Sequence, residues 1–240
     1  MTVGIVIGAT GGIGSACARA LDGSADLILL NGRRREQLEQ HAGHLRSRTG
    51  VVVADIAEEA GRASIVKATA DAGGEIAWLV LASGVPLRGP MPELDPKDIE
   101  RTLLANLVGP TLLIRSLLDL RWTDGAGIVV IGSVSASRAL PNRSVYGGSK
   151  AGLEHLARSL AADLAPRRIR VNVVAPGVID TPFLGDQREL LDRWVRERVP
   201  LGRTGTPDEV AQVVRYLALE SPAYVTGARL AVDGGAESLA

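Results

Sequence analysis

Cysteine is almost absent from this sequence, which has Cys17 alone among its 240 residues. An internal disulfide and a cysteine metal cluster are therefore both excluded. Histidine is also scarce, and the three that occur (His41, His44 and His155) argue against a histidine metal site. Since His41 and His44 lie three residues apart, we expect them to share the polar face of a helix. The sequence predicts no bound metal.

Aromatic side chains are also scarce, and the chain has no net charge. Aromatics make up 3% of a chain that is 46% hydrophobic, so the core must come from Ala, Val, Leu and Ile. The formal net charge is zero, with no long run of one sign, which argues against a nucleic-acid or membrane partner. No apolar stretch approaches the length that crosses a membrane, and no basic leader precedes the first apolar run. We therefore expect a soluble, cytoplasmic protein.

Short apolar runs alternate with longer amphipathic segments along the chain. The runs are rich in Val, Ile and Leu without polar alternation, as in strands buried on both faces. Repeated strand–helix–strand units predict an α/β fold with a parallel sheet and helices on both of its faces. The predicted strands are 3–7, 25–30, 51–54, 78–81, 128–131, 169–174 and 230–232. The predicted helices are 13–21, 34–46, 58–72, 96–120 with a kink at Pro110, 144–164 and 207–219.

The last third of the chain departs from this rhythm. Pro176-Gly177 opens a loop, and residues 183–199 form a charged, amphipathic segment. No linker or internal repeat separates this region from the rest. We interpret residues 1–240 as one domain, with an insertion at about 178–205.

The first predicted strand ends in a glycine-rich turn, Gly8-Ala9-Thr10-Gly11-Gly12-Ile13-Gly14. Such glycines let the backbone approach a ligand closely, and the following helix offers free N–H groups to a pyrophosphate. The spacing is not the G-x-G-x-x-G fingerprint. Its position directly after the first strand nevertheless favours dinucleotide binding over a plain strand-to-helix turn.

The end of the second predicted strand bears on which dinucleotide binds. NAD-selective folds of this kind place a carboxylate there to hold the ribose 2′-OH, whereas this chain reads Asn31-Gly32-Arg33-Arg34. Arg33 offers a planar cation suited to a phosphate, which predicts NADP(H) in preference to NAD(H); its alternative role is ordinary surface charge. Asp55, after the third strand, either accepts a hydrogen bond from an adenine amino group or caps the helix near residue 58.

Tyr146 and Lys150 lie four residues apart in a predicted helix, so their side chains share one face. An ammonium beside a phenol favours the phenolate. The pair therefore predicts a lowered pKa for Tyr146 and a role for it as general acid or base.

In order and spacing these motifs resemble those of the short-chain dehydrogenase/reductases over nearly the whole chain. The likeness is nearest to 3-oxoacyl-(acyl carrier protein) reductases and similar carbonyl reductases. It is carried by the 8–14 turn, Asp55, Asn106, Ser133, Tyr146-x-x-x-Lys150, Pro176-Gly177, Thr181 and Asp233-Gly234-Gly235. The resemblance implies a doubly wound Rossmann-type domain with a seven-stranded parallel sheet, assembled as a homotetramer or homodimer.

The resemblance also implies a catalytic tetrad of Asn106, Ser133, Tyr146 and Lys150. Ser133 would polarise a carbonyl oxygen, Tyr146 would deliver its proton, and Lys150 would lower the tyrosine pKa and hold the nicotinamide ribose. Asn106 would stabilise a helix kink and link Lys150 to solvent through a water. The catalytic role of Ser133 has a rival in a simple strand-end cap, and Ser135 and Ser137 are nearby alternatives to it. Asn106, taken alone, has a rival role as a polar residue satisfied between helices.

The remaining implied site residues fall into two sets. The substrate set is Ser133, Leu140, Tyr146 and Phe183. The cofactor set is Gly8, Thr10, Gly11, Gly12, Ile13, Gly14, Arg33, Arg34, Asp55, Ile56, Ala82, Ser83, Gly84, Tyr146, Lys150, Pro176, Gly177, Val178 and Thr181. The substrate lining reads as mainly apolar, although Arg138, Arg143 and Arg188 are available to an anionic group.

The chain departs from the family pattern at two places. Ile7 stands where the family usually has Thr, and Leu81-Ala82-Ser83-Gly84 replaces the usual Asn-Asn-Ala-Gly. The expected function is NADPH-dependent reduction of a small carbonyl compound, or the reverse oxidation of an alcohol. The alternatives are an NAD-linked dehydrogenase of an alcohol, polyol, sugar or steroid, and an NADP-binding sensor without turnover.

Overall fold

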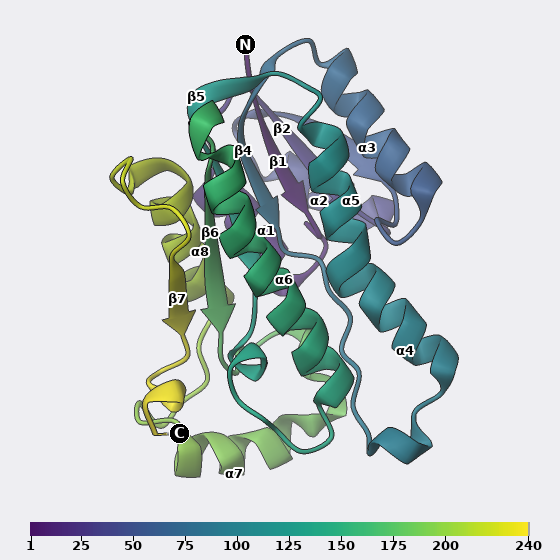
Figure 1. The fold of residues 1–240 in the computed structure, drawn as a ribbon, viewed down its shortest axis with the longest axis vertical. Coiled ribbons are helices and arrows are strands. Elements are labelled where there is room, and N and C mark those ends of the chain that lie inside the picture. Colours follow the sequence, from purple (N-terminus) through teal and green to yellow (C-terminus); the bar gives the residue numbers. More distant parts are fainter. Residues whose placement is uncertain (240) are drawn as a thin grey trace.

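Seven parallel strands form one sheet in the order β3-β2-β1-β4-β5-β6-β7, as the computed structural model shows (Figure 1). The structure describes residues 1–239, and for residues 186–192 and 239 the backbone only. The expected α/β fold with its seven-stranded parallel sheet is confirmed. The strands are β1 (Thr2–Ile7), β2 (Leu27–Gly32), β3 (Arg48–Val53), β4 (Glu75–Leu81), β5 (Trp122–Ile131), β6 (Arg170–Pro176) and β7 (Arg229–Val232).

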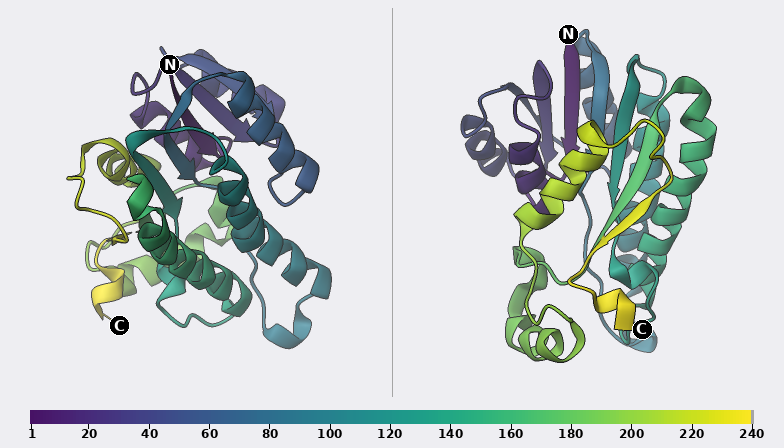
Figure 2. Two further views of the ribbon diagram at one scale, coloured as in Figure 1. Left: turned by 45° about the horizontal axis from the view of Figure 1, so that its top comes forward. Right: turned by 90° about the vertical axis from the view of Figure 1, so that its left-hand side faces the viewer.

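Helices cover both faces of the sheet (Figure 2). One face carries α1 (Gly12–Ala20), α2 (Arg35–Gly43) and α8 (Pro207–Arg215). The other carries α3 (Glu59–Asp71), α5 (Gly109–Leu117) and α6 (Ser144–Leu164). Two further helices, α4 (Pro96–Leu103) and α7 (Arg188–Arg198), lie toward the carboxyl ends of the strands. None of the helices in the described part of the chain has both the length and the apolarity that a membrane crossing needs.

Alternation along β1 shows how the two cores are built. Ile5 and Ile7 pack into the core beneath α3, α5 and α6, whereas Val6 packs on the opposite side with Trp78. A Cβ atom at Gly4 would lie 2.0 Å from the Trp78 ring, so glycine is required for this large side chain to fit. The strand is thus buried on both faces, as its unbroken apolar run predicts.

The long helix predicted at 96–120 is interrupted earlier than expected. A π-helical turn at Leu104–Val108 separates α4 from α5, and there the Gly109 N–H bonds the carbonyl of Leu104, five residues back. Pro110 has no N–H to offer the carbonyl of Asn106, so the regular ladder is already weakened at this point. The kink therefore falls around Asn106 instead of at Pro110.

The chain order reverses between β1 and β4, which are neighbours in the sheet. Loops that leave the carboxyl ends of strands on either side of such a reversal diverge, and the crevice between them is where open α/β sheets bind ligands. The glycine turn after β1 and the Ala82–Gly84 segment after β4 both open onto this crevice.

Candidate active site

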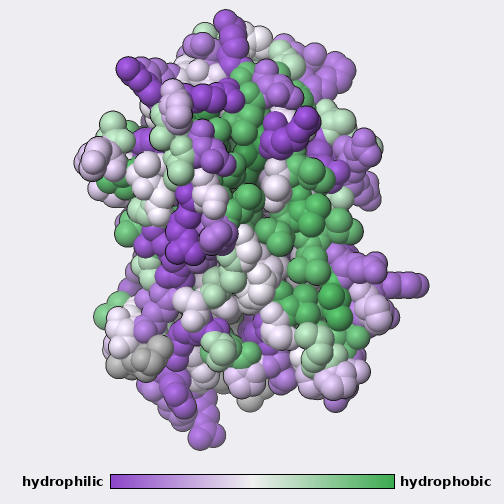
Figure 3. Space-filling model, viewed as in Figure 1, coloured by the Kyte–Doolittle hydropathy of each residue, from purple (hydrophilic) through white to green (hydrophobic). Residues whose placement is uncertain are grey.

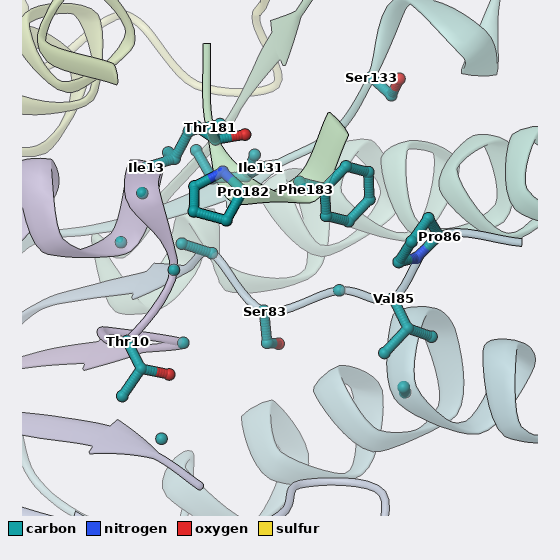
Figure 4. Close-up of a pocket in the computed structure, with 18 of the residues that line it drawn as sticks. Thr10, Ile13, Ser83, Val85, Pro86, Ile131, Ser133, Thr181, Pro182 and Phe183 are labelled. Carbon is teal, nitrogen blue, oxygen red and sulfur yellow. The ribbon is translucent and has the colours of Figure 1, made fainter. Parts of the chain in front are cut away.

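A pocket of about 550 Å³ lies at the carboxyl edge of the sheet (Figure 4). The loops after six strands contribute to it. Of the cofactor residues expected from the sequence, the pocket contains all but Val178: Gly8, Thr10, Gly11, Gly12, Ile13, Gly14, Arg33, Arg34, Asp55, Ile56, Ala82, Ser83, Gly84, Tyr146, Lys150, Pro176, Gly177 and Thr181. Ser133 and Phe183 of the expected substrate set line it as well, whereas Leu140 lies outside its lining.

Val178 and its neighbour point to different places. Ile179 lines the pocket, whereas Val178 packs against Val195, Val199 and Ala236. Since Ile179 pairs with Gly205 in a short β-bridge, the segment is extended there and successive side chains face opposite ways. The alternation of side chains in an extended segment would have identified Ile179, and not Val178, as the pocket residue. It could do so only if the segment itself had been predicted to be extended.

The glycine turn forms a cradle that larger residues would fill. Gly8 has a φ of +84°, and a Cβ atom there would lie 2.7 Å from the Ser83 amide nitrogen. At Gly14 a Cβ would lie 2.1 Å from the Gly8 carbonyl oxygen. The turn leads directly into α1, whose first N–H groups face the pocket and whose first turn carries no acidic side chain. This arrangement suits a pyrophosphate.

A buried hydroxyl in the same pocket, that of Ser83, has no hydrogen-bond partner within the described residues. The Ser83 Oγ is shielded from solvent and makes no hydrogen bond within the described residues. Because a buried hydroxyl without a partner is costly, a ligand with its own hydroxyl groups is favoured beside it. The cradle and this orphaned oxygen together fit the nucleoside and pyrophosphate parts of a dinucleotide.

Two arginines border the pocket where β2 ends. Arg33 lies 3.5 Å from the Asp55 carboxylate, and Arg34 donates to the carbonyl oxygen of Thr10 at 2.9 Å. Asp55 also accepts the Ala57 N–H at 3.0 Å, so it caps the local turn before α3 rather than the helix itself.

Asn31 is a pocket residue that the sequence did not single out. Its buried side-chain amide donates to the carbonyls of Val52 and Ala54, and so ties β2 to the end of β3.

Ser133, Tyr146 and Lys150 come together at the other end of the pocket. Ser133 follows β5, and its hydroxyl oxygen accepts the Ser135 N–H at 3.1 Å. The serine is thus a cap of a short 3₁₀ turn, as one reading of the sequence proposed, and its hydroxyl also lies close enough to the Tyr146 phenol to act on it. Lys150 is buried, and its Nζ donates to the Ile131 carbonyl at 2.9 Å, which leaves two further N–H donors.

Asn106 lies beneath the pocket at the π-helical turn and is fully buried. Its side-chain oxygen accepts the Val85 N–H at 2.8 Å, and its nitrogen donates to the Val85 carbonyl at 3.0 Å and to Ser149 Oγ at 3.1 Å. The side chain therefore fastens the segment after β4 to α6. A Cβ at Gly84 would lie 3.4 Å from both the Asn106 Oδ1 and the Lys150 Nζ, so the two groups border the same glycine.

The electrostatics of Tyr146 differ from the sequence prediction. Burial raises the pKa of Tyr146, and this effect outweighs the lowering by the nearby Ser133 hydroxyl and by Arg143 and Arg88. The expectation that Lys150 lowers it is wrong for this structure. Lys150 is itself buried, and burial lowers its own pKa to about 8 against the opposing charge of Glu154. The phenol is consequently protonated at neutral pH.

The lowered pKa of Lys150 can be measured directly, because the chain has only three lysines. The ammonium is expected to lose its proton as pH rises through about 8, well below the ordinary 10.5. A ¹³C-lysine NMR titration reports it, with the exposed Lys67 and Lys97 as references in the same spectrum. Glu154→Gln should move the Lys150 midpoint to lower pH, since a favourable charge is removed.

Glu237→Gln is the matched control, because Glu237 is not among the groups that act on Lys150. A Lys150 midpoint that stays above 10 in the unaltered protein, or that is the same in both glutamine variants, would contradict this account.

Glu154 is a site residue that the sequence reading missed. It lies one turn after Lys150 on α6, is buried, and accepts the backbone N–H of Ser133 at 3.0 Å. Its second oxygen pairs with Arg229 from β7 at 2.7 Å, and Arg229 in turn holds Glu237. An acidic residue on an otherwise apolar helix face, among Leu153, Ala157 and Ala161, was the available signal.

The departures from the expected motif pack against each other. Ile7 and Leu81 are partners in the β1–β4 register, and both are buried in the core beneath α3, α5 and α6. Ala82 keeps a backbone bond to the Ile7 carbonyl at 2.9 Å. Apolar packing thus takes the place of the polar side-chain ties, and both strands remain fixed at the pocket.

Comparison with known proteins supplies the context for this site. A family model described as Enoyl-(Acyl carrier protein) reductase matches residues 8–237. Carbonyl reductase family member 4 of Danio rerio is 35% identical over 236 residues, which cover 98% of each chain. The 3-oxoacyl-[acyl-carrier-protein] reductase of Bos taurus is 35% identical over 231 residues, 96% of this chain and 95% of the relative. The Brucella melitensis 3-oxoacyl-[acyl-carrier protein] reductase, solved in complex with NAD, superposes with a TM-score of 0.91 at 29% identity, covering 100% of this chain and 98% of that one.

Proposed function

Because this chain belongs to the short-chain dehydrogenase/reductase family of oxidoreductases, we propose that it is an NADPH-dependent carbonyl reductase. It would convert a ketone or a 3-oxoacyl group to an alcohol. The observation that carries the proposal is the buried, protonated Tyr146 beside Ser133 and Lys150, at one end of a pocket whose other end fits a dinucleotide. The segment at about 178–205, through Thr181 and Phe183, would close the substrate end.

The bound nicotinamide would supply the hydride, and the chain's own residues would manage the charge and the proton. As negative charge grows on the carbonyl oxygen, the Ser133 hydroxyl hydrogen donates to it. Tyr146 transfers its phenolic proton to the same oxygen, which completes the alcohol. Lys150, with two N–H donors not used by Ile131, would hold the ribose. The charges of Arg143 and Arg88 would stabilise the resulting phenolate. Asn106, which borders Gly84 together with Lys150, would hold the water through which the proton returns.

NADPH is proposed over NADH from the charges at the end of β2. Arg33 and Arg34 border the pocket, and no acidic residue follows the strand to hold a 2′-hydroxyl. Asp55 lines the pocket there, and it is already engaged by the Ala57 N–H and by Arg33. A guanidinium binds a phosphate with several donors at once, which makes a 2′-phosphate the favoured partner.

The test is oxidation of NADPH and NADH against one panel of carbonyl compounds: a 3-oxoacyl thioester, vicinal diketones, cyclic ketones and keto sugars, with Tyr146→Phe as the blank. NADPH-linked turnover that disappears in the blank is the expected result. Turnover with NADH alone would favour the second candidate, an NAD-linked alcohol, polyol or steroid dehydrogenase, which the NAD complex of the Brucella relative brings into consideration. Tight NADPH binding with no turnover would favour a sensor.

We further propose that α4 and α5 pack against a second copy of the chain. Leu104, Val108 and Leu112 are spaced four residues apart and lie 37 to 41% exposed, which makes an apolar stripe across the π-helical turn. Figure 3 shows hydrophobic side chains gathered on the face where these helices run. A stripe of this kind matches itself when a twofold axis relates two copies.

Light scattering after size exclusion tests this assembly. The unaltered protein is expected to elute as a dimer or tetramer, and Leu112→Glu to elute as a smaller species, because it buries a charge in the interface. Met91→Glu makes the same kind of change at an exposed residue outside the stripe and should leave the mass unaltered. A stable monomer for the unaltered chain would refute the proposal.

A further inference from the structure

Two arginines, Arg143 and Arg88, act on Tyr146 from beside the catalytic end of the pocket and are not among the residues that line it. The Arg143 guanidinium carbon lies 5.9 Å from the centroid of the Tyr146 ring. Arg88, on the segment after β4, is close enough for its charge to act on both Arg143 and Tyr146. A backbone bond of 3.1 Å from the Gly89 N–H to the Asn142 carbonyl holds the two segments side by side. Two cations are thereby fixed beside the acid of the reaction.

Arg143 has no counterion within the described residues. No carboxylate there forms an ion pair with it, and its side chain makes no hydrogen bond to the helix that it precedes. Arg138, the neighbouring candidate from the sequence, is instead bound to the Ala236 carbonyl, and the side chain of Arg188 lies outside the described residues. By contrast, Arg203 and Arg229 each bind a carboxylate at 2.6 Å.

The environment of Arg143 makes the absence of a counterion energetically unfavourable. The side chain is half-buried, and burial together with the charge of Arg88 lowers its pKa. The positive end of α6 adds to the same field, since the first turn of that helix contains no acidic side chain. A partly desolvated guanidinium without a counterion, such as that of Arg143, is stabilised when an anion reaches it.

We propose that Arg143, with Arg88 beside it, forms a subsite for a carboxylate carried by the substrate. A guanidinium binds a carboxylate through two parallel N–H donors, so charge and geometry are both satisfied. The substrate class would then be small oxo acids, or the corresponding hydroxy acids, with the carboxylate on the Tyr146 side of the reacting carbon. Phe183, whose ring centroid lies 6.0 Å from that of Tyr146, supplies apolar contact for the carbon skeleton. This inference rests on the proposed function, because it places the anion next to the reducible carbonyl.

Binding of benzoate and of benzamide, which have the same shape but differ in charge, tests the subsite without turnover. Calorimetry on the unaltered protein should show benzoate binding at least about tenfold more tightly, which corresponds to about 1.4 kcal/mol. The difference should disappear in Arg143→Gln and shrink in Arg143→Lys, which keeps the charge but loses the planar fork. Arg121→Gln, an exposed arginine just before β5 at the opposite edge of the sheet, is the matched control and should keep the difference.

A second arm uses the reaction. The unaltered enzyme should reduce an oxo acid with a kcat/KM at least about tenfold above that of its methyl ester, and Arg143→Gln should remove the preference. Equal binding of benzoate and benzamide, no benzoate binding at millimolar concentration, or a preference that survives in Arg143→Gln would overturn the subsite. If esters and ketones are reduced without preference for the acid, the reductase proposal stands and the subsite falls. If benzoate binds as expected and no carbonyl is reduced, the subsite stands and the reductase proposal falls.

Discussion

Replacing Tyr146 by phenylalanine is expected to lower kcat for carbonyl reduction by about a hundredfold to ten-thousandfold, the usual contribution of a positioned general acid. The ring stays in place against Phe183 and Arg143, and only the hydroxyl is lost. Cofactor affinity should therefore change far less than kcat. Stopped-flow hydride transfer and fluorescence titration with NADPH measure the two quantities on the same protein.

Tyr224→Phe is the natural control, because that phenol is fully exposed and far from the chemistry. If Tyr146→Phe retained more than about a tenth of the unaltered rate, water or another group would have to be the acid. If it lost NADPH binding together with turnover, the tyrosine would serve to build the cofactor pocket rather than to transfer a proton.

Reversing the charge of Arg33 should produce the second-largest change. Arg33→Asp is expected to lower the preference for NADPH over NADH, measured as a ratio of kcat/KM values, by roughly tenfold to a hundredfold. That range follows from about 1.5–3 kcal/mol for a hydrogen bond to a charged group. The new carboxylate would repel a 2′-phosphate and accept from a 2′-hydroxyl, so NADH should gain while NADPH loses. Asp55, left without its partner, would add to the repulsion of the phosphate.

Arg35→Asp makes the same charge reversal two residues further on, where the side chain is exposed on α2 and pairs with Glu39. It should leave the cofactor ratio close to that of the unaltered enzyme. If the kcat/KM ratio changes equally in both variants, the effect of Arg33 comes from the overall charge near the pocket and not from a direct contact with the cofactor. A ratio that does not move in Arg33→Asp would mean that Arg33 does not contact the 2′-phosphate.

The sheet could be predicted almost completely from the sequence, because its strands are unbroken apolar runs buried on both faces. Six of the strands begin within a few residues of their expected starts, and β5 extends further toward the amino end, beginning at Trp122. The interruption of the long helix was indicated twice, by Pro110 from local chemistry and by Asn106 from the family resemblance, and the π-helical turn at Leu104–Val108 contains Asn106. The bonds between Asn106 and Val85, which lies 21 residues earlier in the chain, have no local signal.

Whether a site residue could be predicted likewise depends on whether its contacts are local or distant in the chain. The glycine turn, Ser133, Tyr146 and Lys150 are legible because their neighbours in sequence determine their geometry. The pKa of Tyr146 was predicted in the wrong direction, because burial depends on the whole fold and outweighs the nearby charges. Glu154 escaped notice for a related reason: its partners Ser133 and Arg229 come from distant parts of the chain. Arg143 was one of three arginines considered for an anionic group, and the sequence could not separate it from Arg138 because the contacts that distinguish them are distant.

The bonds among Ser133, Glu154, Arg229 and Glu237 also set an order of events during synthesis. The residues that line the dinucleotide pocket, the last of which is Gly185, are all synthesised before Arg229. The backbone of Ser133 is then held by Glu154, yet the charge of Glu154 has no counterion until Arg229 is made, and Arg229 has its second carboxylate only with Glu237. All residues of the dinucleotide pocket are therefore present in a nascent chain before the bonds that fix the catalytic serine can form. We expect the chain to bind the dinucleotide before it can react, and the delay to be roughly the time needed to add the last strand.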